Sequence, residues 1–170
     1  MAQSMIDRMK GAALLDVATY EEVEADTTAT AQAGMVVLLA AIAQAIGGIG
    51  QGGVGIVGGA VAALVGWVLW SGITYLIGDK LLGGTATWGE LLRTIGFAQA
   101  PQVLAVLAIL PVLGGLVRAV VVVWVLIAGV IAIRQALDFS TGKAIATALL
   151  GWLTIAIPAA LLGGALGLGR

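Results

Sequence analysis

The stretch from Ala98 to Ile133 is apolar almost without interruption. As a single helix it would be about 54 Å long at 1.5 Å per residue. A bilayer core is only about 30 Å thick and takes about 20 helical residues. The pair Gly114-Gly115, followed by Arg118, divides the stretch, and an arginine at the centre of a membrane would cost at least ~2.5 kcal/mol. We therefore expect two membrane-spanning helices here, joined by a turn at the glycine pair.

Composition extends this expectation to the whole chain. Charged residues make up 10% of the 170 residues and hydrophobic residues 61%, whereas a soluble domain carries about a quarter charged residues. Lipid must therefore be the solvent for much of the chain. We predict an all-α fold, a polytopic transmembrane helix bundle with short cytoplasmic amphipathic helices. A cytoplasmic segment at 1–28 would precede a transmembrane domain at 29–168, with five spans at 29–49, 54–77, 98–116, 118–136 and 144–168.

The distribution of charge predicts the orientation of the bundle. With the N-terminus inside, six of the eight Lys and Arg residues lie in inner segments, and only Arg118 and Arg170 lie outside. This satisfies the positive-inside rule. All nine Asp and Glu residues also fall inside. The segment before the first apolar run is acidic rather than basic, so we interpret that run as a retained helix and not as a signal peptide.

The first 28 residues predict two short helices. Thr19 and Glu22 form a capping-box pattern that would begin an acidic helix over 19–25, and Asp26 would cap the first span, where the helix dipole favours a carboxylate. The acidic residues between 16 and 26 lack EF-hand spacing, so we interpret them as a solvated face rather than a metal site. A helix over 1–15 would lie at the membrane interface or pack against the bundle. Its apolar face contains Met5, Ile6, Met9 and Ala13.

A second capping box, formed by Thr87 and Glu90, precedes a helix that runs through Phe97. Glu90 and Arg93 fall on one side of this helix and its leucines on the other. Trp88 is a residue type typical of the membrane interface. We therefore expect an interfacial helix that leads into the third span.

Catalytic and metal chemistry find little support in the sequence. The chain has no His and no Cys, which excludes the usual zinc sites and His-based acid–base catalysis. We expect no enzyme activity, no cofactor and, with a net charge of −1, no nucleic-acid partner. Gln44, in the first span, is interpreted as an interhelical hydrogen-bonding residue, with a pore-lining role as the alternative. The deep polar residues are Gln44, Ser71, Thr74, Gln99 and Thr154.

Small residues predict close packing of helices, and prolines predict kinks. Gly55 and Gly59 form a GxxxG pair that would pack within the bundle or form the seam of a homo-oligomer. The glycine-rich residues 47–53 predict a tight turn and lack the Lys-Ser/Thr of a phosphate-binding loop. Pro111 and Pro158 fall inside the third and fifth predicted spans and would kink them.

Three groups of motifs follow one another along the chain. The first comprises MIDRMKG at 5–11, TYEEVEAD at 19–26 and ATAQA at 29–33. The second is TWGELLRTIGFAQAP at 87–101, and the third is RQALDFSTGKA at 134–144. In order and spacing they resemble the bacterial Yip-domain (Ypt/Rab-interacting protein) family of integral membrane proteins. The second group resembles that domain's Gly-Tyr…Pro segment before its third helix, with Phe97 in place of the tyrosine.

The resemblance implies a multi-pass protein of the bacterial inner membrane, with a cytoplasmic N-terminus and no known catalytic centre. Eukaryotic relatives are associated with small Rab-type GTPases and vesicle traffic, but the Asp-Leu-Tyr motif of their N-terminal region is not found here. A GTPase partner is thus implied by resemblance alone. We expect a scaffold or adaptor that contacts lipid and other membrane proteins or further copies of itself. A transporter, channel or lipid-handling protein is the alternative. The candidate interaction or structural residues are Asp26, Gln44, Gly55, Gly59, Glu90, Arg93, Phe97, Gln99 and Pro101.

Overall fold

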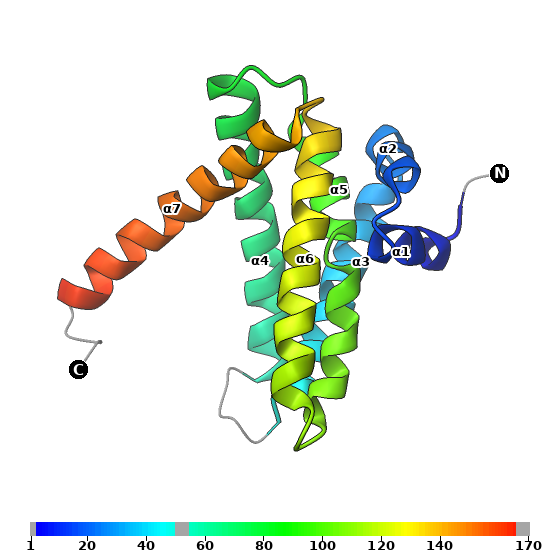
Figure 1. The fold of residues 1–170 in the computed structure, drawn as a ribbon, viewed down its shortest axis with the longest axis vertical. Helices are drawn as coiled ribbons and strands as arrows, with labels where there is room; N and C mark the ends of the chain where they lie inside the picture. The colour runs from blue at the N-terminus through cyan, green and yellow to red at the C-terminus, as the bar shows by residue number, and fades with distance from the viewer. Residues whose placement is uncertain (1–2, 50–54, 166–170) are drawn as a thin grey trace.

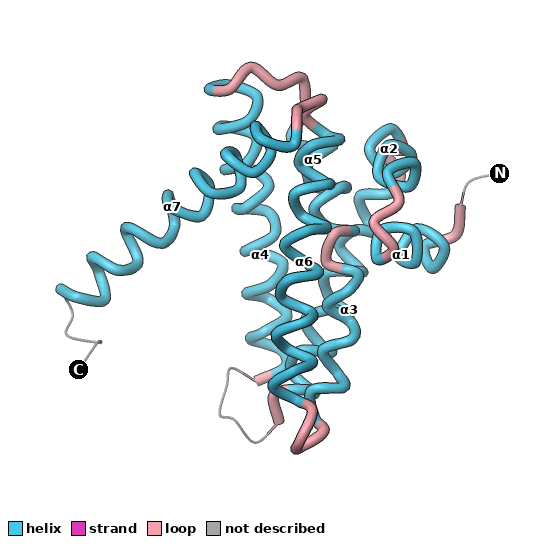
Figure 2. Tube along the Cα trace, in the orientation of Figure 1, coloured by secondary structure: helices cyan, strands magenta, loops and turns pink. Residues whose placement is uncertain are grey.

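The computed structural model describes residues 3–49 and 55–165, without the side chains of 156 and 159–165. In this part of the chain every regular element is a helix (Figure 2), which confirms the all-α prediction. The elements are α1 (Met5–Ala13), α2 (Val17–Ala25), α3 (Ala29–Gly47), α4 (Ile56–Tyr75), the π-helix η1 (Leu76–Leu81), α5 (Trp88–Phe97), the 3₁₀-helix η2 (Ala100–Ile109), α6 (Gly114–Ala136) and α7 (Thr141–Ala165).

Four helical segments within the described residues are long and apolar enough to cross a membrane. They are Ala29–Gly47, Ile56–Leu81, Trp88–Ile109 and Gly114–Ala136. These segments run alternately up and down the long axis of the molecule (Figure 1). The loop at 82–87 and the start of α7 lie at one end, which we call the charged end. The end of α3 at Gly47 and the turn at 110–113 lie at the opposite end.

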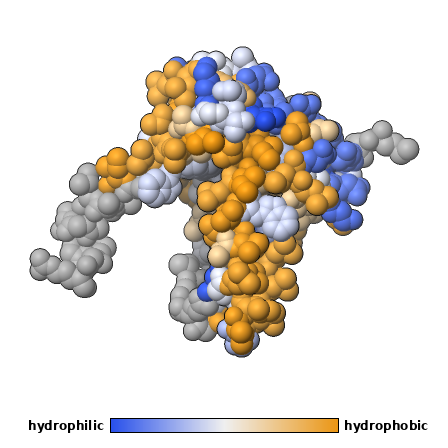
Figure 3. All heavy atoms as spheres, viewed as in Figure 1, coloured by the Kyte–Doolittle hydropathy of each residue, from blue (hydrophilic) through white to orange (hydrophobic). Residues whose placement is uncertain are grey.

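Hydrophilic atoms gather at the charged end and over α1 and α2, whereas the body below is largely hydrophobic (Figure 3). This division is what a bilayer-embedded bundle with one polar end requires. α7 projects away from the other helices (Figure 1). It is apolar over Thr141–Ile155, and a fifth span over 144–168 stays a prediction. Most of the predicted glycine turn at 47–53 lies outside the described residues.

The third span differs from the prediction at both ends. α5, expected at the membrane interface, lies inside the bundle, and Leu91 and Phe97 are fully buried. The interfacial interpretation is wrong because α2, α3, α4 and α6 all pack around α5. The chain then turns at 110–113, so Pro111 lies in a turn rather than within a span. α6 begins at Gly114, which places Arg118 inside its second turn.

The lower half of the third span is a 3₁₀-helix rather than an α-helix. Pro101, in the first turn of η2, has no N–H to donate. The tight winding continues for ten residues, although runs beyond three or four are uncommon. Side chains three residues apart eclipse one another in this geometry. One column of residues on η2 therefore contains Gln99, Gln102, Ala105 and Ala108.

The two N-terminal helices form a hairpin, α1–α2, that packs on the bundle. The side chain of Asp16 accepts the Thr19 N–H and caps α2, which begins at Val17. The predicted Thr19–Glu22 capping box is therefore wrong. Tyr20 and Val23 of α2 are fully buried in the hydrophobic core, so the hairpin belongs to the folded domain.

The face that α1 turns toward the bundle also differs from the prediction. Ile6 is 59% exposed, whereas Arg8 and Ala12 are buried. Met5 and Met9 pack against the core as expected. The indole N–H of Trp124 on α6 donates a 2.7 Å hydrogen bond to the Ala13 carbonyl at the end of α1. Of the two placements left open for this segment, the structure shows packing against the bundle.

Candidate functional site

A buried arginine holds the hairpin together. Arg8 is 1% exposed, and its guanidinium donates to both carboxylate oxygens of Glu22, at 2.9 and 2.5 Å. It also donates to Asp26 Oδ2 at 2.5 Å and to Gln32 Oε1 at 2.9 Å. One side chain thus joins α1, α2 and the first turn of α3. Hydrogen bonds to both carboxylates raise the pKa of Arg8, so it remains charged at any physiological pH.

Asp26 lies at the junction between α2 and α3, but the prediction that it caps the first span is wrong: Thr28 is the N-cap of α3, and α3 has no side-chain cap hydrogen bond. Its Oδ1 accepts the backbone N–H and the hydroxyl of Thr28, at 2.9 and 2.6 Å, directly before α3 begins. Its backbone carbonyl accepts the N–H of Ala29 at 2.9 Å. The Thr28 hydrogen bonds and the Arg8 guanidinium lower the pKa of Asp26 to about 2. The carboxylate is therefore ionised and fixed in place at neutral pH.

A second buried arginine attaches the hairpin to the bundle. Arg93 of α5 is 6% exposed, and its Nε donates to the carbonyls of Val23 and Glu24, at 3.0 Å each. Its Nη2 also donates to the Glu24 carbonyl. Both acceptors lie in the last turn of α2, where helix carbonyls lack partners within the helix and the dipole favours a cation. Arg93 therefore caps the C-terminus of α2.

Four acidic side chains gather around this attachment at the charged end. Glu90 completes the predicted capping box, since its Oε2 accepts the Thr87 N–H at 2.7 Å. Glu21 accepts a hydrogen bond from Gln135 of α6 at 2.9 Å, and Asp138 accepts one from Thr85 at 2.7 Å. We call this group the acidic platform. Its members are Glu21 and Glu24 of α2, Glu90 of α5 and Asp138 after α6.

The other members of the acidic platform act electrostatically on Glu24. Partial burial and the charges of Glu90 and Asp138 raise the pKa of Glu24 to about 7. Arg93 opposes this rise and Glu21 adds to it. Within the described residues no group of three or more acidic side chains could hold a metal ion. The platform is therefore a negatively charged surface built from three elements.

Three of the predicted residues line a groove in the membrane-spanning part. Gln44 of α3 and Gln99 of α5–η2 border a groove of about 370 Å³, and Gly59 on α4 forms part of its wall. The expected interhelical hydrogen bond of Gln44 is not seen among the described residues, where its side chain is exposed. Gln44 also borders a smaller neighbouring pocket of about 190 Å³ with Gln102 and Arg118.

Other polar residues of the spans do not join this groove. Ser71 and Thr74 on α4 are fully buried, and their hydroxyls have no hydrogen-bond partner among the described residues. Thr154 on α7 donates to the carbonyl of Gly151 at 2.7 Å. The five deep polar residues predicted from the sequence therefore scatter, and only the glutamines converge.

The remaining predicted residues are buried in the protein or lie at the end of a helix. Phe97 is fully buried in the hydrophobic core, and Pro101 is buried at the start of η2. Gly55 precedes α4, and a methyl group added to it would meet nothing within 4 Å. Close packing within this chain does not require that glycine, and a homo-oligomer seam at Gly55 and Gly59 stays a prediction.

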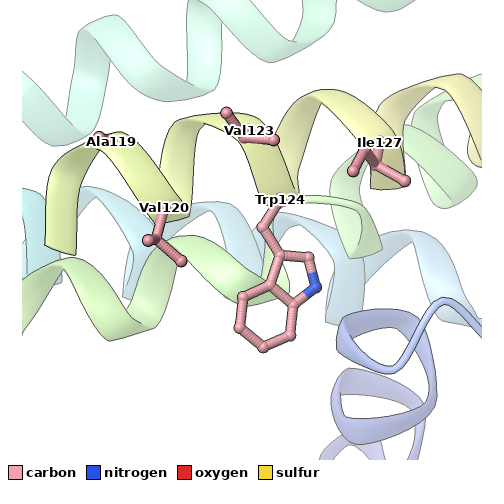
Figure 4. A pocket seen from close by; sticks show the side chains of 5 residues that line it. All are labelled: Ala119, Val120, Val123, Trp124 and Ile127. Atoms are coloured by element: carbon pink, nitrogen blue, oxygen red, sulfur yellow. The ribbon is translucent and has the colours of Figure 1, made fainter. Parts of the chain in front are cut away.

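An apolar hollow lies on the outer surface of α6 below α1. Its lining residues all come from α6 (Figure 4), and the Trp124 ring extends toward the N-terminal helix. The lining carries almost no polar surface. A surface of this kind suits contact with lipid chains and offers no group for recognition or chemistry. The lining residues are Ala119, Val120, Val123, Trp124 and Ile127.

Sequence reasoning missed Arg8, Gln102 and the role of Glu24. Arg8 falls between Met5, Met9 and Ala12, on the stripe that a helix would bury. A charge inside an apolar stripe signals a buried partner. Gln102 follows Gln99 by three residues, a spacing that places both on one face of a helix. Its position beside Gln44 depends on the packing of α3 against η2, which the local pattern does not encode.

Comparison with known proteins agrees with these features. A family model described as the Yip1 domain matches residues 18–163. This match includes nearly all of α2, the spans and most of α7. No curated protein matches the chain, and no solved structure matches it. Because this match covers most of its length, the chain belongs to the Yip1 domain family of membrane proteins.

Proposed function

We propose that this protein is a non-enzymatic membrane adaptor that presents the acidic platform to a basic surface of a cytoplasmic protein. The observation that carries this proposal is the rigid attachment of α1–α2 to the bundle. Arg93 and Arg8 hold α2 in one position, so the acidic residues of α2 and α5 have a fixed arrangement. A preorganised surface loses less entropy on binding than a mobile segment does.

Orientation supports the same proposal. The charged end and the hairpin α1–α2 together contain all the Asp and Glu residues and most of the Lys and Arg residues of the chain. The positive-inside rule favours the cytoplasm for this side of the molecule. The platform would then face cytoplasmic proteins. Small GTPases are the first class to test, because the family resemblance suggests them.

The proposal is tested by neutralising the platform without changing its shape. The variant E21Q/E24Q/E90Q/D138N replaces each carboxylate with an amide of the same size. The E90Q change keeps a side chain that can complete a capping box, and asparagine tolerates the positive φ of 53° at position 138. The full chain is crosslinked in membranes, and the captured proteins are identified and quantified by mass spectrometry.

We expect the variant to lose most of one captured cytoplasmic protein, and the wild-type complex to weaken as salt concentration rises. D7N is the matched control, because Asp7 is an exposed acid on α1 outside the platform. Equal capture by the wild type and the fourfold variant would contradict the proposal. Deletion of 1–26 is a poorer test, because it would expose Arg93 and part of the core.

A further inference from the structure

Three glutamines and one arginine meet in the apolar half of the molecule. Gln44 borders both the larger groove with Gln99 and the smaller pocket with Gln102 and Arg118. The two hollows are therefore neighbours that share one side chain. Within the described residues, the side chains of these glutamines have no hydrogen-bond partner in the protein. Figure 3 shows a small hydrophilic patch on the otherwise hydrophobic lower body.

The backbone geometry of η2 and α3 places these side chains close together. The 3₁₀ winding of η2 eclipses Gln99 and Gln102 on one column. Gly47 lets α3 approach that column closely, because a methyl group there would lie 2.0 Å from the Ala105 carbonyl oxygen. The Gly47 carbonyl accepts a 2.7 Å hydrogen bond from Arg118 Nη2. Gln44 lies one turn before Gly47, beside the same contact.

Unsatisfied amides in hydrocarbon are costly, since transfer of such a group from water without a hydrogen bond costs roughly 2–7 kcal/mol. Two such amides line each hollow, and Gln44 lines both, which indicates a polar occupant. Arg118, whose guanidinium also donates to the Gly47 carbonyl, adds a positive charge to this part of the molecule. An anion or a strong hydrogen-bond acceptor is the chemistry that fits.

Depth distinguishes a lipid from a soluble anion. Arg118 lies four residues into α6, about 6 Å from its start, and Gln44 lies about 5 Å from the end of α3 at 1.5 Å per residue. Gln102 lies about 14 Å from the end of η2 at 2.0 Å per residue. Half of a hydrocarbon core is about 15 Å. The polar groups thus extend from headgroup depth to below the ester groups of one leaflet.

The larger groove suits the rest of such a molecule. Its wall on α4 contains the small residues Gly59, Ala63 and Gly66. Trp67 and Trp70 close it on the side of the charged end. An added methyl group at Gly66 would meet open space, so no described residue fills the groove at this point. An acyl chain can occupy a hollow of this shape.

We propose that the two hollows form one binding site for an anionic phospholipid of the leaflet at the opposite end. Arg118 binds the phosphate, Gln102 lies deeper in the same pocket below the ester groups, and the acyl chain lies along Gly59, Ala63 and Gly66. Gln44 bridges the two parts. This site is at the end of the bundle away from the acidic platform and does not depend on the proposed adaptor function.

The test is native mass spectrometry of the purified full chain in detergent, titrated with dioleoylphosphatidylglycerol or dioleoylphosphatidylcholine. We expect about tenfold tighter binding of one phosphatidylglycerol molecule, the preference that one charge-assisted contact provides. R118Q should lose this preference, and Q44L/Q102L should weaken the binding of both lipids. The matched control R134Q/Q135L changes an Arg and a Gln at the charged end and should bind as the wild type does.

Equal binding of the two lipids by the wild-type protein would overturn the proposal without reliance on any variant. Displacement of the bound lipid by inorganic phosphate alone would overturn the assignment to a lipid. Unchanged phosphatidylglycerol preference in R118Q would do the same for the role of Arg118. Thermal unfolding of each variant in detergent separates lost binding from lost folding.

Discussion

The Nε of Arg93 lies 3.0 Å from the carbonyl oxygen of Val23, a residue seventy positions earlier in the chain. This hydrogen bond crosses from the third span to the N-terminal hairpin. It makes the hairpin α1–α2 part of the domain rather than a tail, because the arginine supplies the C-terminal cap of α2. The acidic platform therefore depends on a side chain that lies in the membrane domain.

Replacing Arg93 with glutamine should detach the hairpin. The guanidinium donates to two carbonyls from a buried position, and hydrogen bonds to charged groups contribute about 1.5–3 kcal/mol. We expect a lower thermal unfolding temperature in detergent and faster proteolysis within α1–α2. The control is R134Q, because the Arg134 side chain bonds only its neighbour Gln135 among the described contacts. Equal proteolysis of R93Q and the wild type would refute the capping role.

Substitution of Arg8 should lower the stability of the protein more than substitution of any surface charge of the hairpin. Substitution by methionine leaves Glu22 and Asp26 facing each other without a cation, and breaking a buried ion pair costs about 3–5 kcal/mol. Both carboxylates are partly exposed, so the lower part of this range is expected. Lys10 on the same helix is exposed, and K10M should change unfolding little. Chemical unfolding of both variants in detergent compares them; similar midpoints would contradict the buried pairing.

The raised pKa of Glu24 should make the stability of the protein depend on pH. Burial first, and then Glu90 and Asp138, raise its pKa to about 7 from an ordinary value of 4.5. Between these values the folded chain binds more protons than the unfolded chain, so the free energy of unfolding falls as pH rises. We expect the unfolding temperature to drop by roughly 1–3 °C between pH 5 and pH 7.5, the size of a solvent-screened effect below about 1 kcal/mol.

The variant E24Q isolates this effect, because an amide of the same shape does not titrate. Its unfolding temperature should be nearly constant over the same pH range, with Glu90, Asp138, Glu21 and Arg93 left unchanged around it. The measurement is a series of thermal unfolding curves at constant ionic strength. If E24Q keeps the full pH dependence of the wild type, another group is responsible.

Gly47 should be the most restrictive glycine of α3. A methyl group at this position would lie 2.0 Å from the Ala105 backbone oxygen, and overpacking costs typically about 1–3 kcal/mol. G66A is the matched control in a neighbouring helix, where a methyl group meets nothing within 4 Å. It should be neutral or stabilising, since alanine favours a helix by about 1 kcal/mol over glycine. Equal unfolding of G47A and G66A would show that α3 and η2 do not pack as described.

The sequence predicts the apolar part of this fold well because periodicity and length decide it. The spans and the turn beside Gly114 follow from hydrophobic runs that a bilayer must accommodate. The capping box at Thr87 and Glu90 follows from local hydrogen-bond geometry. Each of these features depends on residues close together in the chain.

What sequence reasoning missed depends on contacts between distant segments. The burial of α5 arises because α2, α3, α4 and α6 pack around it, and no local pattern encodes those contacts. The predicted capping box at Thr19 is wrong because Glu22 accepts a hydrogen bond from Arg8 and Asp16 is the N-cap of α2. The neighbouring positions of Gln44 and Gln102 depend on the packing of α3 against η2, a contact between distant segments.

A cytoplasmic partner can reach the acidic platform only if the charged end faces the cytoplasm. Because the chain contains no cysteine, single substitutions S140C at the charged end and I49C at the opposite end report orientation without background. Both positions are exposed. Intact cells are treated with a membrane-impermeant maleimide and labelling is compared with that after lysis. We predict that I49C is labelled in intact cells and S140C only after lysis; labelling of S140C in intact cells would contradict the proposed function.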